Sequence, residues 1–153
     1  MEDIKRILVV SRMTKCCRKT LHYGVSLSQK YGADLFVMHA LHNPFGLEGW
    51  NLPMVSMEED YKRELQKAKK ELDALVKKEI KAGMSVQELV LEGEPTEAIL
   101  KTVQKEKIDL LIMTAHEEGR LEHFLFGQSN DEITRRMPCT VLLVKEHLKT
   151  VRF

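Results

Sequence analysis

Several side chains that could bind an anion stand directly after two short apolar runs of the chain. Ser11 and Arg12 follow the run at residues 7–10, and Glu117 comes shortly after the run at 110–113. A guanidinium group can hold a phosphate or a carboxylate through two parallel hydrogen bonds, so Arg12 could clamp a small anion. Alternatively, Arg12 forms an ion pair with Glu117 and leaves no free charge for a ligand. Both alternatives stay open on the sequence.

The turn after the first run contains no glycine. Residues 11–17 read Ser-Arg-Met-Thr-Lys-Cys-Cys. Dinucleotide-binding loops and P-loops both need glycines where the backbone approaches the phosphate groups. Their absence argues against a Rossmann oxidoreductase and against a P-loop kinase. A phosphorylation receiver would need acidic residues at the end of this run to hold Mg²⁺, and Ser11 and Arg12 do not supply them.

The other reactive side chains show no spacing that is typical of catalysis or of metal binding. No Gly-x-Ser-x-Gly elbow is present, and no histidine or cysteine spacing marks a zinc site. We therefore predict no catalytic residue and no metal ion, although four histidines fall where strands should end: His39, His42, His116 and His123.

The elements that must position these side chains alternate along the chain. Short continuous apolar runs are typical of strands buried on both faces, and apolar residues three and four apart are typical of helices. The sequence predicts strands at 7–10, 34–40, 86–91, 110–114 and 141–144, separated by helices at 14–31, 56–82, 95–103 and 129–136. The last helix opens with a capping box in which Ser129 is the N-cap, and Pro95 takes the first position of the third helix.

Alternation of strands and helices requires parallel strands joined by right-handed crossovers. The expected fold class is therefore α/β, with a single open, doubly wound, five-stranded parallel sheet and helices on both faces. Ligands bind such sheets beyond the carboxyl ends of the strands, where the strand order reverses. The candidate ligand-binding residues lie at those ends: Val10, Ser11, Arg12, Ala40, Met113, Thr114, His116, Glu117, Gly127, Gln128 and Ser129.

Composition narrows the class of protein. The 153 residues carry 24 Lys plus Arg and 23 Asp plus Glu, a formal net charge of +1, which argues against a nucleic-acid binder. The apolar runs are too short to span a membrane, the N-terminus lacks the pattern of a signal peptide, and three cysteines without paired spacing favour a reducing compartment. We expect a cytoplasmic protein with no membrane or nucleic-acid partner.

Several short motifs, in their order along the chain, resemble those of the universal stress protein family. They are the first strand at 7–10, Leu21-His22-Tyr23-Gly24, Tyr31-Gly32-Ala33-Asp34-Leu35, Met38-His39-Ala40, Gly93-Glu94-Pro95 and the run Met-Pro-Cys-Thr-Val-Leu-Leu-Val at 137–144. The resemblance implies one universal stress protein-type domain over residues 1–153, with a flavodoxin-like or adenine-nucleotide α-hydrolase-like sheet.

Nucleotide-binding members of that family carry Gly-x-x-Gly, nine further residues, and then Gly followed by Ser or Thr. Thr114, Glu117, Gly127 and Gln128 stand at the four defining positions, so only the third agrees. A β-branched side chain and a negative charge at the two glycine positions oppose the close approach of a polyanion. Arg12 also replaces an aspartate of the family's first loop, whereas His116 matches a family position.

The resemblance therefore implies a non-catalytic, cytoplasmic regulatory or binding protein with a degenerate nucleotide site and no required cofactor. The alternative is a universal stress protein that binds ATP or AMP in a remodelled crevice and hydrolyses ATP slowly. We expect a homodimer, because an unprotected final strand invites pairing with a second copy. Its interface residues would be Val141, Leu142, Leu143 and Val144. A small anionic ligand or a partner protein is the other expected partner.

Overall fold

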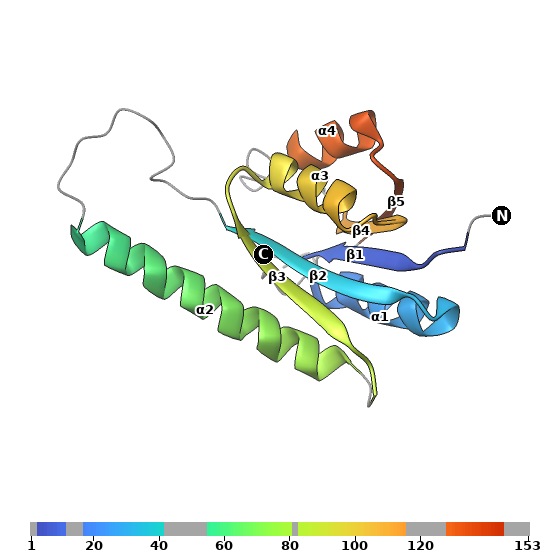
Figure 1. The fold of residues 1–153 in the computed structure, drawn as a ribbon, viewed down its shortest axis with the longest axis horizontal. Helices are drawn as coiled ribbons and strands as arrows, with labels where there is room; N and C mark the ends of the chain where they lie inside the picture. The colour runs from blue at the N-terminus through green and yellow to red at the C-terminus, as the bar shows by residue number, and fades with distance from the viewer. Residues whose placement is uncertain (1–2, 12–16, 42–54, 81–82, 116–127, 146–153) are drawn as a thin grey trace, which may run out of the picture.

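The computed structural model describes residues 3–11, 17–41, 55–80, 83–115 and 128–145. Strands and helices alternate through these ranges (Figure 1). They are β1 (Arg6–Val10), α1 (Cys17–Tyr31), β2 (Asp34–Leu41), α2 (Val55–Glu79), β3 (Val86–Glu92), α3 (Pro95–Lys105), β4 (Leu110–Thr114), α4 (Gln128–Arg136) and β5 (Thr140–Val144). The alternation confirms the predicted α/β fold class.

All neighbouring strands of the sheet are parallel, and their order is β3-β2-β1-β4-β5. The chain first builds outward from β1 to β3 and then returns to place β4 on the free side of β1. Ile7 of β1 lies opposite Leu35 of β2 and Leu110 of β4. The strand order therefore reverses between β1 and β4, and we call the carboxyl ends of these two strands the switch point.

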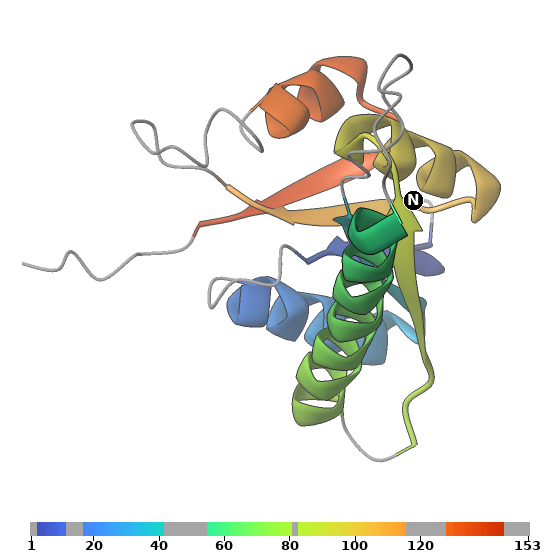
Figure 2. The same cartoon turned by 90° about the vertical axis from the view of Figure 1, so that its left-hand side faces the viewer.

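Helices cover both faces of the sheet, as the sequence predicts. Figure 1 and Figure 2 show α1 and α2 on one face and α3 and α4 on the other. The change of face follows from the reversal of direction, because every crossover from one parallel strand to the next is right-handed.

The first strand supplies both cores. Ile7 and Val9 face the helices α1 and α2, whereas Leu8 and Val10 face α3 and α4. Successive side chains of a strand point to opposite faces, so a continuous apolar run fits a position between two helical layers. All four side chains are at most 7% exposed, which confirms the prediction of a strand buried on both faces.

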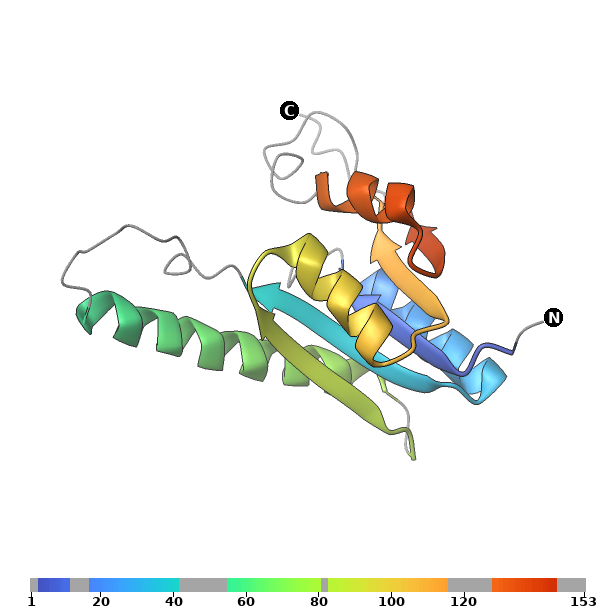
Figure 3. The same ribbon diagram turned by 45° about the horizontal axis from the view of Figure 1, so that its top comes forward.

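One helix extends beyond the sheet. Figures 1 and 3 show that the N-terminal half of α2 continues past the carboxyl end of β2. The side chains of α2 that are buried in the core, Ala68, Leu72 and Val76, all lie in its C-terminal half. The N-terminal half of α2 therefore contributes little to the hydrophobic core.

Two predicted helix starts need comment. The structure begins α4 at Gln128, so Ser129 lies inside the first turn and the prediction of Ser129 as the N-cap is wrong. The reason is tertiary, since Asn130 is anchored to β4 through the carbonyl of Thr114 and the helix begins before that anchor. The predicted start of the first helix at residue 14 falls within 12–16, outside the described residues, whereas Pro95 does open α3.

Candidate functional site

The structure describes part of the predicted ligand site. Val10, Ser11, Ala40, Met113 and Thr114 lie at the carboxyl ends of β1, β2 and β4, and all except the half-buried Ala40 are at most 7% exposed. The backbone of α4 includes Gln128 and Ser129, but their side chains lie outside the description, as do Arg12, His116, Glu117 and Gly127.

Thr114 ends β4, and its hydroxyl points into the protein. The Oγ1 atom lies 2.7 Å from Oγ1 of Thr20, which comes from α1 and is fully buried. Thr114 itself is 7% exposed. Its hydroxyl therefore joins α1 to β4 rather than standing ready for a ligand.

The backbone of Thr114 is also occupied. Nδ2 of Asn130, in α4, donates a hydrogen bond of 2.8 Å to the carbonyl oxygen of Thr114. Asn130 is 7% exposed, so this bond forms away from bulk water, where a lost partner costs about 1–3 kcal/mol. Helices from opposite faces of the sheet, α1 and α4, thus fix the last residue of β4.

The end of β1 is tied to β2 in a similar way. The amide of Ser11 donates to the carbonyl oxygen of Met38 at 2.7 Å, and Nδ1 of His39 lies 2.9 Å from the carbonyl oxygen of Ser11. Because a carbonyl oxygen can only accept, the hydrogen of the imidazole is on Nδ1. Nε2 of a neutral His39 is then left as an acceptor.

The first helix contributes one cation near this end of the sheet. Nζ of Lys19 donates to the carbonyl oxygen of Lys145, directly after β5, at 2.8 Å. Its neighbour Arg18 forms a 2.6 Å ion pair with Glu79 of α2. Both cations at the start of α1 are therefore used in joining elements, within the part of the chain that is described.

The described part of the switch point offers little catalytic chemistry. A threonine hydroxyl becomes a nucleophile when an adjacent base takes its proton, and the neighbour of the Thr114 hydroxyl is another threonine. Nor do the described residues bring three or more histidine, cysteine or acidic side chains together as a metal site. In the described region, the ends of β1 and β4 are held by hydrogen bonds to neighbouring elements.

Thr20 and Asn130, the residues that bond to Thr114, were not identified from the sequence. Thr20 is separated from Thr114 by 94 positions, and no local pattern connects the two. No local signal marks Asn130 either, because its place in an apparent capping box indicates only the start of a helix.

The final strand lies at one edge of the sheet, where it pairs with β4 among the described strands. Of the predicted dimer residues, Leu143 is 44% exposed and Val141 and Leu142 are half-buried. Val144 is 4% exposed and belongs to the core under α1 and α2, so its side chain is not available to a partner.

No described helix is long and apolar enough to cross a membrane. This finding concerns the helices α1 to α4 alone.

Comparison with known proteins gives a consistent result. A model of the universal stress protein family matches residues 3–145. A universal stress protein of Thermus aquaticus is 33% identical over 128 residues, which cover 77% of this chain and 82% of the relative. A universal stress protein of Methanocaldococcus jannaschii is 25% identical over 150 residues, covering 95% and 84% of the two chains.

Solved structures share the fold. The structure of the Methanocaldococcus jannaschii protein MJ0577 superposes with a TM-score of 0.74 at 21% identity, covering 97% of this chain and all of that one. A universal stress protein of Archaeoglobus fulgidus in complex with dAMP gives 0.63 at 15% identity, with 95% and 100% covered. A universal stress protein in complex with cAMP gives 0.60 at 17%, with 94% and 98% covered.

Proposed function

This chain belongs to the universal stress protein family, and from that premise we propose that it is a non-catalytic regulatory or binding protein with a degenerate nucleotide site. One observation carries the proposal: Thr114, where nucleotide-binding members have their first glycine, is held by its hydroxyl and by its carbonyl. We place its action in the cytoplasm.

The physical argument concerns the space and the polar groups that a phosphate chain needs. Glycine allows backbone amides to approach phosphate oxygens closely, whereas Thr114 adds a side chain that anchors β4 to Thr20 of α1. Moving this residue aside would break bonds that are buried on both sides. The sequence adds a negative charge at Glu117, at the second glycine position, which opposes a polyanion further.

The alternative function is the binding of ATP or of an AMP-type nucleotide in a remodelled crevice. It is favoured by the complexes of two structurally similar universal stress proteins with dAMP and with cAMP. A monophosphate carries less charge than ATP, so the missing glycines would weaken its binding less. Ala40, which is half-buried at the end of β2, would then supply an apolar contact to the base.

The proposal predicts that the purified protein releases no stoichiometric nucleotide on heat denaturation. In calorimetric titrations, ATP and AMP should bind with a Kd weaker than about 1 mM, because the Thr114 hydroxyl is paired with Thr20 and two glycines of the nucleotide-binding motif are missing. The Archaeoglobus fulgidus protein, titrated with dAMP, is the positive control. Stoichiometric release of ATP or AMP, or a micromolar Kd, would establish the alternative instead.

We propose in addition that two copies associate through β5. Among the described strands β5 pairs with β4 alone, and pairing with a second copy would remove its outer edge from water. Leu143 is the exposed apolar side chain of this strand. An antiparallel pair of β5 strands would place the two copies of Leu143 in one interface with twofold symmetry.

Leu143→Glu is expected to weaken the dimer at least tenfold, since it places a carboxylate in the middle of an apolar contact, at a cost of about 1.4 kcal/mol or more. Light-scattering mass over a concentration series measures the change. Leu143→Val, which keeps an apolar side chain suited to a strand, should leave the dimer intact. A wild-type protein that is monomeric at micromolar concentration would exclude the interface.

A further inference from the structure

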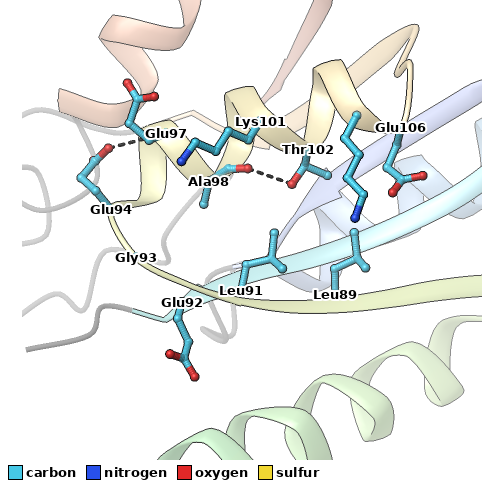
Figure 4. A pocket seen from close by; sticks show the side chains of 11 residues that line it. Leu89, Leu91, Glu92, Gly93, Glu94, Glu97, Ala98, Lys101, Thr102 and Glu106 are labelled. Carbon is cyan, nitrogen blue, oxygen red and sulfur yellow. Dashed lines mark hydrogen bonds between the residues drawn. The ribbon is translucent and has the colours of Figure 1, made fainter. Parts of the chain in front are cut away.

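A second site lies beside β3, at the edge of the sheet that is farther from β4 and β5. It is a pocket of about 320 Å³ between α3 and the edge strand β3 (Figure 4). Its volume is at the lower end of the range for small-molecule sites. No residue of the switch point lines it, so a ligand of this pocket would bind independently of the proposed function.

The pocket has an apolar floor. Leu89 and Leu91 of β3 line it together with Ala98 of α3, and all three belong to or pack against the core between the sheet and α3. Both leucines stay half-exposed, because no further strand lies beyond β3 among the described residues. An apolar group that covered them would be removed from water, at about 25 cal/mol per Å² of buried surface.

Two polar side chains of the lining form hydrogen bonds with the backbone of α3. The carboxylate of Glu94 caps α3, with its two oxygens accepting from the amides of Thr96 at 3.1 Å and Glu97 at 2.9 Å. The hydroxyl of Thr102 donates to the carbonyl oxygen of Ala98 at 2.8 Å. Neither group is left to bind a ligand.

Two further carboxylates face arginines. Oε1 of Glu97 lies 3.1 Å from Nη1 of Arg136 in α4, and Figure 4 shows the Glu97 side chain directed toward that helix. Oε2 of Glu106 lies 4.0 Å from Nη1 of Arg6, which also donates to the Glu106 carbonyl oxygen at 2.7 Å. With these arginines counted, four glutamates are balanced by four cations around the pocket.

The fourth carboxylate turns away from the pocket. Figure 4 shows the side chain of Glu92 pointing toward α2, where it interacts with Tyr61. Burial, the interaction with Glu92 and the nearby carboxylate of Glu64 raise the pKa of Tyr61 to about 12. The Glu92 carboxylate is therefore directed toward Tyr61 and not into the pocket.

Two lysines remain. Lys101 and Lys105 line the pocket from adjacent turns of α3, about 6 Å apart along the helix axis. Within the described part of the chain, neither forms an ion pair or a side-chain hydrogen bond. Figure 4 shows the Lys101 side chain running along α3 toward the Glu94 end of the pocket. The side-chain donors of the pocket that have no partner among the described residues are therefore the two positively charged ammonium groups.

We propose that this pocket binds a small amphipathic carboxylate, whose anionic group is held by Lys101 and Lys105 and whose apolar body covers Leu89, Leu91 and Ala98. The positive charges of the two lysines favour an anionic ligand, since the carboxylates around the pocket already have partners. The apolar floor selects a ligand with a hydrocarbon or aromatic portion over inorganic phosphate.

The test uses 3-phenylpropionate as the probe, with 3-phenylpropanamide as its neutral counterpart and 3-phenylpropylammonium as its charge-reversed one. Amide chemical shifts of the full-length protein should move saturably with 3-phenylpropionate, with a Kd of about 1 mM, and the largest changes should fall on β3 and α3. 3-Phenylpropanamide should bind about fivefold more weakly than 3-phenylpropionate, and 3-phenylpropylammonium should not bind.

The variant K101Q/K105Q is expected to weaken 3-phenylpropionate binding about fivefold to tenfold, because both stems remain while both charges are lost. Lys70→Gln, on the exposed face of α2, is the matched control and should leave the Kd unchanged. Leu91→Ala should weaken the binding of 3-phenylpropionate and of 3-phenylpropanamide by the same factor. Equal binding of acid and amide, an unchanged Kd in K101Q/K105Q, or no saturable shift up to about 20 mM would each overturn the proposal.

Discussion

Replacing Gly24 by valine is expected to lower the free energy of unfolding by about 3 kcal/mol, because α1 leaves no room for a side chain between this residue and β1. A Cβ atom built on Gly24 would overlap Cγ2 of Val9, which is fully buried in the centre of the sheet. Either the helix or the strand must therefore move. Urea denaturation followed by circular dichroism measures the loss.

A double-mutant cycle isolates the contact. Gly24→Ala alone adds overlap, whereas Val9→Ala alone leaves a cavity in the core. Combined, the new methyl group occupies the space that Val9 gives up. The double variant should therefore be more stable than the sum of the single effects by about 1–2 kcal/mol.

Gly32→Ala is the control for the loss of a glycine without overlap. No atom lies within 4 Å of a Cβ at this position, but its φ of +64° is strained for any other residue, so a loss of only about 1 kcal/mol is expected. Strictly additive effects of Gly24→Ala and Val9→Ala would show that the two residues are not in contact.

The second large effect is a gain of nucleotide binding. The variant R12D/T114G/E117G should raise the affinity for ATP by about 100-fold, which corresponds to about 2.7 kcal/mol. It restores two glycines and one aspartate at the positions where nucleotide-binding universal stress proteins carry them. Thr114→Gly and Glu117→Gly remove a β-branched side chain and a negative charge from the predicted path of the phosphates, whereas Arg12→Asp supplies the carboxylate that the family resemblance implies beside the adenosine. Calorimetric titration with ATP measures the gain.

The structure adds a requirement to this experiment. Thr114→Gly leaves the buried hydroxyl of Thr20 without the partner that now lies 2.7 Å away, at a cost of about 1–3 kcal/mol. Adding Thr20→Val removes that hydroxyl and should recover the stability. R12D/E117G, which keeps Thr114, is the matched control and should gain much less. If R12D/T114G/E117G with Thr20→Val folds but does not bind ATP, Thr114 does not cause the degeneracy of the site.

The fold could be predicted from the sequence because its signals are local and repeated. The run at 7–10 is apolar without interruption, and only a strand between two helical layers buries every one of those side chains. The strand at 110–114 was likewise predicted with its observed bounds. Once nine elements alternate, the handedness of the crossovers leaves few arrangements of the sheet.

The site was less predictable, because its hydrogen bonds join distant segments. The position of Thr114 at a strand end follows from the sequence, but the pairing of its hydroxyl with Thr20 depends on how closely α1 packs on the sheet. The same holds for Asn130, whose amide reaches Thr114 because α4 lies on the opposite face. Local patterns describe helix starts and strands, and they carry no information on such distances.

The pocket beside α3 shows a different limit. Its lysines stand four residues apart on a helix, a spacing common on any solvated face. What distinguishes Lys101 and Lys105 is that the neighbouring carboxylates are already engaged, and Arg6 and Arg136 come from β1 and α4 to do so. A sequence shows which charges are present but not which of them are already paired.

The projection of α2 beyond the sheet has a consequence for how the molecule opens. Backbone hydrogen bonds in the N-terminal half of that helix are supported by side chains such as Tyr61 and Leu65 that are only half-buried, whereas those near Leu72 rest on the core. A helical segment of a few turns is marginally stable in water without tertiary support. The free energy of local opening therefore rises along α2 from its N-terminus to its C-terminus, so this helix can fray and re-form from one end while the sheet stays folded.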